Sequence, residues 1–181
     1  MLYKERDEKK RKIFTENIKN ISKDNLVYID ESGIDCFLNK SHGWAKRGEL
    51  VHGTNSGKRY ARESFVAAKC GTKIMAPFCY QGTCNTGLFN IWLEKILLPE
   101  LKPGQLVIMD NAAFHKSLKT KELIESAGCK IMFLPPYSPD LNPIEKFWAN
   151  LKEKVKNTIS QFDTLQQTID HSFKLYTCQS K

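Results

Sequence analysis

The sequence predicts an α/β domain in which helices pack on the faces of a mixed sheet. Two short runs, 26–29 and 106–109, are wholly apolar and each is followed by an aspartate, which is typical of buried strands that end at a sheet edge. Strand-like segments come first along the chain, and strands alternate with helices afterwards. The 181 residues suffice for one domain with a continuous core, so these segments are expected to share a sheet.

The first half of the chain predicts a helical lead-in followed by strands. Residues 4–20 are expected to form a charged helix that packs loosely on the domain through its few apolar residues. The apolar run 26–29 predicts a buried strand that stops at Asp30. Three further strands are predicted at residues 36–46, 64–69 and 73–80, with a turn at Gly71 between the last two.

The second half alternates helices with strands. In order, it predicts a helix over 88–98, a strand over 106–109 ending at Asp110, a helix over 117–127, a strand over 130–134, a proline-rich loop and two helices, the last over 163–176. Asn142 is expected to cap the helix after the loop, with Pro143 in its first position. Phe147 and Trp148 lie on the apolar face of that helix and are predicted to be core residues.

Composition limits the classes of function. The balance of 28 Lys and Arg against 20 Asp and Glu gives a net charge of +8, which favours a polyanionic partner such as nucleic acid. No apolar run is long enough to cross a bilayer, and the charged start carries no secretory signal. The six cysteines include no CxxC pair, which argues against a disulfide framework and a zinc knuckle. A cytoplasmic protein is expected.

Positive charge gathers in two places that are candidate DNA contacts. The glycine-containing segment 40–62 predicts a basic hairpin and loop, and the helix after the loop carries a basic face. The candidate contacts are Lys46, Arg47, Lys58, Arg59, Lys146 and Lys152. Trp44 could stack on a base, but a hairpin aromatic that covers the sheet explains it as well.

The two aspartates that follow apolar strands are the main candidates for chemistry. If the strands are parallel neighbours, Asp30 and Asp110 lie side by side and repel each other unless a cation lies between them. Carboxylate oxygens are preferred ligands of Mg²⁺ and Mn²⁺. The alternative is that each aspartate begins a turn or caps a helix.

Glu145 is the third candidate ligand, because a carboxylate in the first turn of its helix points toward the sheet edge. The alternative is a capping box, in which Glu145 contacts the backbone amide of Asn142. His115 could contact a phosphate, although a place at a helix start or in solvent explains it equally well. Asp140 is expected in a turn, and strand alternation excludes Glu31 as a ligand beside Asp30.

Three segments carry a resemblance to a known family. VYIDESG at 27–33, VIMDNAAFHKS at 107–117 and LPPYSPDLNPIEKFWANLK at 134–152 resemble the DDE domain of Tc/mariner-superfamily transposases, especially the bacterial insertion-sequence branch. The resemblance spans about residues 25–157, and 34 residues separate Asp110 from Glu145, as is typical of that branch. It implies an RNase H-like fold with a mixed five-stranded sheet and helices on both faces.

The resemblance also implies an activity. Asp30, Asp110 and Glu145 match the three acids that hold two divalent ions, Mg²⁺ or Mn²⁺, for cleavage of transposon ends and strand transfer into target DNA. The implied partners are double-stranded DNA with a TA target, which deforms easily, and a second copy of the chain in a homodimer. The implied place is the nucleoid of a bacterial cytoplasm. Two other functions stay open: a catalytically idle DNA-binding remnant, and an RNase H-like nuclease.

The sequence departs from the family before its first strand. Family members carry helix-turn-helix recognition domains there, whereas about 24 residues precede the first strand of this sequence. A truncated element, the second product of a frame-split gene or an isolated domain is expected, with a separate helix-turn-helix protein as one partner. The predicted division is a lead-in over 1–24, a catalytic domain over 25–160 and a C-terminal helix over 161–181.

Overall fold

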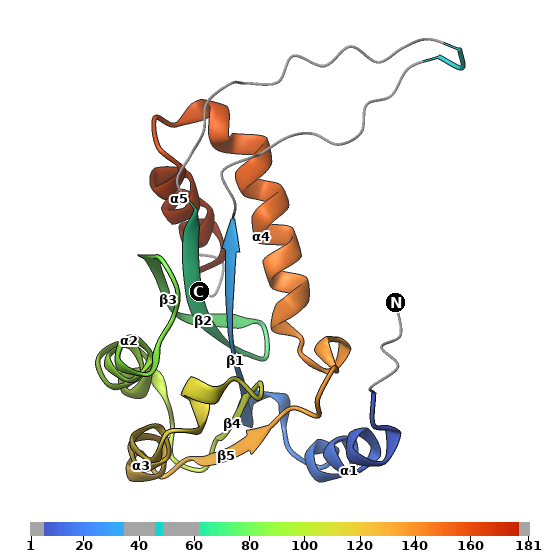
Figure 1. The fold of residues 1–181 in the computed structure, drawn as a ribbon, viewed down its shortest axis with the longest axis vertical. Coiled ribbons are helices and arrows are strands. Elements are labelled where there is room, and N and C mark those ends of the chain that lie inside the picture. The colour runs from blue at the N-terminus through green and yellow to red at the C-terminus, as the bar shows by residue number, and fades with distance from the viewer. Residues whose placement is uncertain (1–5, 35–45, 49–61, 178–181) are drawn as a thin grey trace.

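Five strands form one mixed sheet in the order β3-β2-β1-β4-β5 in the computed structural model, which describes residues 6–34, 46–48 and 62–177 (Figure 1). The strands are β1 (Leu26–Ile34), β2 (Glu63–Cys70), β3 (Lys73–Gln81), β4 (Leu106–Met109) and β5 (Lys130–Phe133). The pairs β1–β2 and β2–β3 are antiparallel, and the pairs β1–β4 and β4–β5 are parallel. The predicted mixed sheet is therefore confirmed.

One strand is longer than its apolar run predicts. β1 continues past Asp30 to Ile34, because its second half pairs with β2 up to the partners Ile34 and Glu63. The prediction that this strand stops at Asp30 is wrong. The backbone of β2 supplies hydrogen-bond partners to the second half of β1. The polar residues there therefore stay extended, although they show no apolar strand pattern. The predicted strand over 36–46 lies outside the described residues, except for Lys46.

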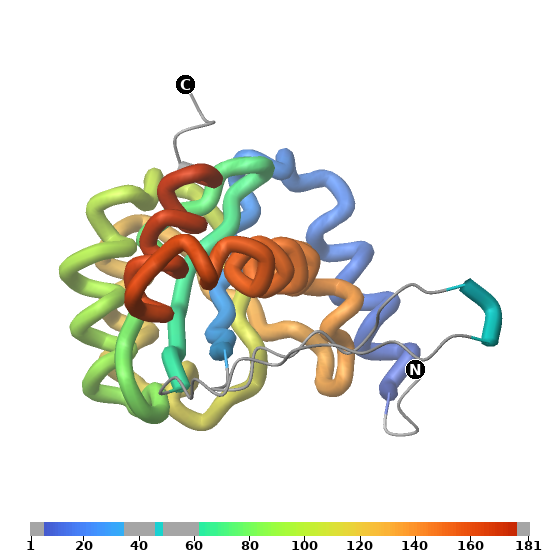
Figure 2. The backbone as a smooth tube through the Cα atoms, turned by 90° about the horizontal axis from the view of Figure 1, so that it is seen from above, coloured from blue at the N-terminus to red at the C-terminus, as the bar shows by residue number. Residues whose placement is uncertain are grey.

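Helices cover both faces of the sheet. They are α1 (Glu8–Ile18), α2 (Thr86–Trp92), α3 (Leu118–Ser126), α4 (Ile144–Thr158) and α5 (Leu165–Thr177). The helix predicted over 88–98 is α2 followed by a π-helical turn over Leu93–Leu97 and a 3-10 turn over Leu98–Glu100. Figure 2 shows α2 and α3 on one side of the strands and α1 and α4 on the other.

The core divides according to the alternation of side chains along β1. Val27 and Ile29 belong to the buried cluster under α2 and α3, which also holds Trp92. The indole of Trp92 donates a hydrogen bond to the carbonyl of Ala76 at 2.9 Å, so its polar group is satisfied in the core. On the opposite face, an aromatic cluster from α4 and α5 packs on Phe65.

The N-terminal helix packs more firmly than expected. Asp7 caps α1 by accepting hydrogen bonds from the amides of Lys9 and Lys10. Phe14 is 4% exposed and lies in a cluster with the first residues of β1 and β4. The prediction of loose packing is therefore wrong. In the described ranges, no helix is both long enough and apolar enough to cross a membrane.

Candidate active site

The two candidate aspartates occupy equivalent positions along neighbouring parallel strands. The parallel pairing of β1 with β4 matches Val27 with Val107 and Tyr28 with Ile108. Two residues further on, the same offset places Asp30 opposite Asp110. Neighbouring strands lie about 4.8 Å apart, so the two carboxylates leave the sheet side by side. The prediction that these strands are parallel neighbours is confirmed.

Glu145 lines the same cavity as the two aspartates. The cavity has a volume of about 400 Å³ and lies at the sheet edge where β4 ends. Its wall is formed by the three acids, the loop over 134–139, Asn111 and Asn142. Glu145 reaches it from the first turn of α4. The alternative capping box is not formed, because the amide of Asn142 donates to the carbonyl of Pro139.

The surroundings of Asp30 disfavour its charged form. Burial of Asp30, together with the charges of Glu145, Glu31 and Asp110, raises its pKa to about 8. One carboxylate oxygen accepts the amide of Glu31 at 3.0 Å, and the other accepts the indole N–H of Trp148 at 3.2 Å. Trp148 is a core residue, as predicted, and it also orients Asp30.

The surroundings of Asp110, unlike those of Asp30, favour its charged form. Its Oδ1 accepts the ring Nδ1–H of His115 at 2.7 Å and the amide of Ala112 at 2.9 Å. The hydrogen bond from His115 is the main cause that keeps the pKa of Asp110 below its usual range. Its Oδ2 accepts no hydrogen bond from any residue in the described ranges. One oxygen is thus fixed, and the other is left for a ligand.

His115 bridges two carboxylates from inside the protein. Its Nε2 lies 3.0 Å from Glu31 Oε1, and its side chain has no exposed area. Burial of His115 acts to lower its pKa, but the hydrogen bonds to Asp110 and Glu31 outweigh burial and raise the pKa to about 9. The predicted contact of His115 with DNA is wrong, because both ring nitrogens are occupied and the ring is buried.

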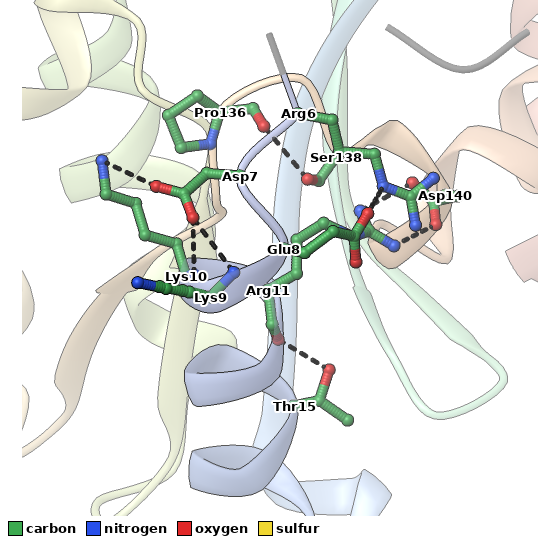
Figure 3. A network of polar contacts seen from close by, with 10 residues as sticks. All are labelled: Arg6, Asp7, Glu8, Lys9, Lys10, Arg11, Thr15, Pro136, Ser138 and Asp140. Atoms are coloured by element: carbon green, nitrogen blue, oxygen red, sulfur yellow. Dashed lines mark hydrogen bonds and ion pairs between the residues drawn. The ribbon is translucent and has the colours of Figure 1, made fainter. Parts of the chain in front are cut away.

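The loop that walls the cavity is tied to the N-terminal helix. Figure 3 shows Arg11 of α1 beside Asp140, and the guanidinium donates to both carboxylate oxygens at 3.0 and 2.6 Å. Arg11 is 7% exposed. Asp140 lies in a turn, as predicted, and Tyr137 adopts a positive φ of 53°. The Arg11–Asp140 pair therefore holds the end of a loop in which a non-glycine residue adopts a rare backbone conformation.

The donor set suits a hard divalent cation that other ligands complete. Three carboxylates line one cavity, and Mg²⁺ or Mn²⁺ binds through carboxylates together with water and substrate phosphate. Within the part of the chain that the structure describes, no group of three or more His, Cys, Asp or Glu side chains is arranged to hold a metal ion by itself. The acids thus fit an open site, and their role as ligands stays a prediction.

The described lysine and arginine candidates for DNA contact do not line this cavity. Lys146 follows Glu145 on α4 but lines a separate cavity with Lys69, and Lys152 is half-buried on the same helix. Lys46 and Arg47 are exposed, and Arg47 begins a turn. The predicted contacts Lys58 and Arg59, and Trp44, are outside the described residues.

Two residues of the site were missed by sequence reasoning. Glu31 leaves β1 on the face opposite Asp30, which is consistent with its exclusion as a direct ligand, yet it reaches Asp110 through His115. Trp148 lies three residues after Glu145, so a helix places both on one face. That spacing was the available signal for Trp148, whereas no local pattern connects Glu31 with His115.

Comparisons with known proteins agree with this geometry. A family model described as DDE superfamily endonuclease matches residues 25–168. The insertion element IS630 uncharacterized 39 kDa protein of Shigella sonnei is 27% identical over 135 residues, which cover 72% of this chain and 38% of that protein. The Tcb2 transposase of Caenorhabditis briggsae is 27% identical over 162 residues, which cover 78% of this chain and 58% of that protein. The chain thus spans less than two thirds of both relatives.

Solved structures support the fold. The Mos1 strand transfer complex matches with a TM-score of 0.67 at 16% identity, covering 97% of this chain and 61% of that chain. The catalytic core domain of BIV integrase matches with a TM-score of 0.56 at 10% identity, covering 83% and 82%. The RNase H-like fold is therefore confirmed. Because the family model covers most of the chain and includes Asp30, Asp110 and Glu145, the chain belongs to the DDE superfamily endonuclease family.

Proposed function

We propose that this chain is the catalytic domain of a DNA transposase, a metal-dependent polynucleotidyl transferase that cleaves transposon ends and joins them to target DNA. The observation that carries the proposal is the register of β1 and β4, which sets Asp30 opposite Asp110 at one cavity with Glu145. Relatives named as an insertion-element protein and a transposase support the choice of DNA as substrate.

The residues of the site have different proposed roles, which follow from their positions. Asp30, Asp110 and Glu145 would hold two divalent ions, Mg²⁺ or Mn²⁺. When bound, the ions supply activation of the attacking oxygen and neutralise charge that develops on the phosphate. Trp148 donates to Oδ2 of Asp30 and His115 donates to Oδ1 of Asp110, so both aspartates are oriented, and Asp110 keeps one oxygen without a described hydrogen-bond donor. The Arg11–Asp140 pair holds the loop that forms its wall.

We also propose partners for this chain. Solved complexes of Mos1 transposase include a paired-end complex with a transposon end and complexes with Mn and with Mg, which supports DNA and these metals here. We retain a homodimer, a TA target and a separate helix-turn-helix protein as proposed partners, and the division at residues 24 and 160 as the proposed domain limits. A bacterial cytoplasm is proposed as the location, since the insertion-element relative is from Shigella sonnei.

Joining of DNA ends tests the proposed activity directly. A duplex with a free 3′-hydroxyl at a transposon-type end is incubated with the chain, Mg²⁺ and a supercoiled plasmid, because a ready 3′-end needs only the transfer step. The expected result is covalent joining at TA sites, measured by sequencing the junctions. Nicking of the plasmid without joining, or hydrolysis of RNA in a hybrid at a higher rate, would replace this proposal with the nuclease alternative.

DNA binding by this chain is expected to depend strongly on salt and weakly on sequence. Lysines contact phosphates and displace counterions, so the logarithm of affinity should fall with the logarithm of salt by about 0.9 for each contact. Reversing the charges of Lys46 and Arg47 should weaken binding to every duplex alike, because phosphate contacts carry no base information. Titration of inverted-repeat and scrambled duplexes at several salt concentrations measures this. A salt-insensitive preference for the repeat would reveal a further recognition element.

A further inference from the structure

Asn142 lies in the wall of the acid-lined cavity and has a buried amide oxygen without a hydrogen-bond partner among the described residues. The residue is 5% exposed, and its Oδ1 is among the buried side-chain atoms of the described chain that have no hydrogen-bond partner. Asn142 lines the same cavity as Asp30, Asp110 and Glu145. A buried acceptor without a donor destabilises the folded chain unless a ligand or solvent supplies the missing partner.

The side chain of Asn142 does not form the helix cap that the sequence predicts. Asn142 was expected to cap α4, but the helix begins at Ile144 after Pro143 and receives no side-chain cap. The amide of Glu145 donates instead to the backbone carbonyl of Asn142 at 3.2 Å. The backbone of Asn142 is therefore satisfied in both directions, because its own amide donates to the carbonyl of Pro139 at 2.9 Å. Of the buried polar atoms of Asn142, the side-chain oxygen has no partner in the described ranges.

The surroundings of Asn142 select the class of ligand. Three acids at one cavity attract a cation, and in their ionised form they offer no donor to an amide oxygen. Amide carbonyls, like carboxylates, are oxygen ligands of hard divalent cations. We infer that Asn142 is an additional oxygen ligand of the divalent cation that Asp30, Asp110 and Glu145 bind. The inference rests on the proposed function, since it assigns a further residue to the same metal site.

The test compares two substitutions with opposite expected effects on stability. In the absence of metal, Asn142→Leu should raise the melting temperature by about 2–4 °C, because it removes a buried unpaired acceptor. Asn142→Asp should lower it, because a fourth carboxylate joins three others. Titration with Mn²⁺ alone, followed by the rise in melting temperature, should show affinity weakened about 10-fold in the leucine variant and retained in the aspartate variant.

The control is Asn150→Leu, an exposed asparagine on the same helix, which should change neither property. A capping role would give the opposite pattern, since aspartate is a good N-cap and leucine is a poor one. Equal Mn²⁺ affinity in wild type and Asn142→Leu would overturn the inference, and the proposed function would stand if Asp110→Asn still lost Mn²⁺. Absence of any Mn²⁺ binding by wild type would overturn both.

Discussion

Replacing Asp110 by asparagine is expected to reduce DNA cleavage and strand transfer by more than about 100-fold, because even the outer partners of metal ligands are worth 10–100-fold. The substitution preserves shape but removes the negative charge of a carboxylate that lines the cavity and has one oxygen without a described hydrogen-bond donor. DNA affinity should stay unchanged or increase, because the variant repels phosphate less. The variant therefore distinguishes a role of Asp110 in catalysis from a role in DNA binding.

The measurement is single-turnover cleavage and joining in Mg²⁺, with DNA affinity from a parallel titration. Asp163→Asn is the matched control, since Asp163 is exposed between α4 and α5 and lines none of the cavities described above. Activity of Asp110→Asn above a few per cent of wild type would contradict the metal role of Asp110. A parallel loss of DNA affinity would mean that the aspartate acts in binding.

Removing the carboxylate of Glu31 is expected to weaken metal binding at Asp110 by about 10–100-fold without touching the cavity. Glu31 accepts from the far nitrogen of His115, and the near nitrogen donates to Asp110. Without Glu31, the imidazole loses the partner that fixes its orientation and favours its charged form. Glu31→Gln retains an acceptor and should recover part of the affinity, whereas Glu31→Ala should recover none.

The same bridge predicts a pH dependence of stability. Since the pKa of His115 rises to about 9, its stabilising contribution is fully present below about pH 6.5 and is lost as the pH rises through 9. Asp30 acts in the same direction, because burial raises its pKa from 3.8 to about 8, so its contribution to stability falls progressively as the pH rises between these two values. The metal-free domain should therefore lose stability between pH 6.5 and 9.

Urea unfolding in EDTA at several pH values, together with Mn²⁺ titration, measures both effects. In Glu31→Ala the fall in the free energy of unfolding across this window should be smaller, because His115 loses one of its two carboxylate partners and the charge of Glu31 no longer raises the pKa of Asp30. Glu153→Ala, an exposed glutamate on α4, should behave as wild type. If Glu31→Ala retained the wild-type slope and metal affinity, the bridge would have no part in positioning Asp110.

Much of the fold and the positions of the three acids could be predicted from the sequence. The apolar runs before Asp30 and Asp110 marked two strands because a strand buried on both faces admits no polar residue. A parallel sheet then aligns the ends of such strands, so the juxtaposition of the two aspartates followed from local pattern and a general rule. The segment around Glu145 indicated both a helix start and its family.

The support of those acids was decided only by the tertiary structure. Glu31 and His115 are 84 residues apart in sequence, Asp30 and Trp148 are 118 apart, and Arg11 and Asp140 are 129 apart. Local patterns report which face of an element is buried, but they do not report which polar groups meet when two faces pack. The sequence by itself thus determined the sheet and its carboxylates. The packing of distant elements determined which carboxylate oxygens accept hydrogen bonds. The reason is that a buried polar group pairs with the donors or acceptors that the neighbouring element places within hydrogen-bond distance.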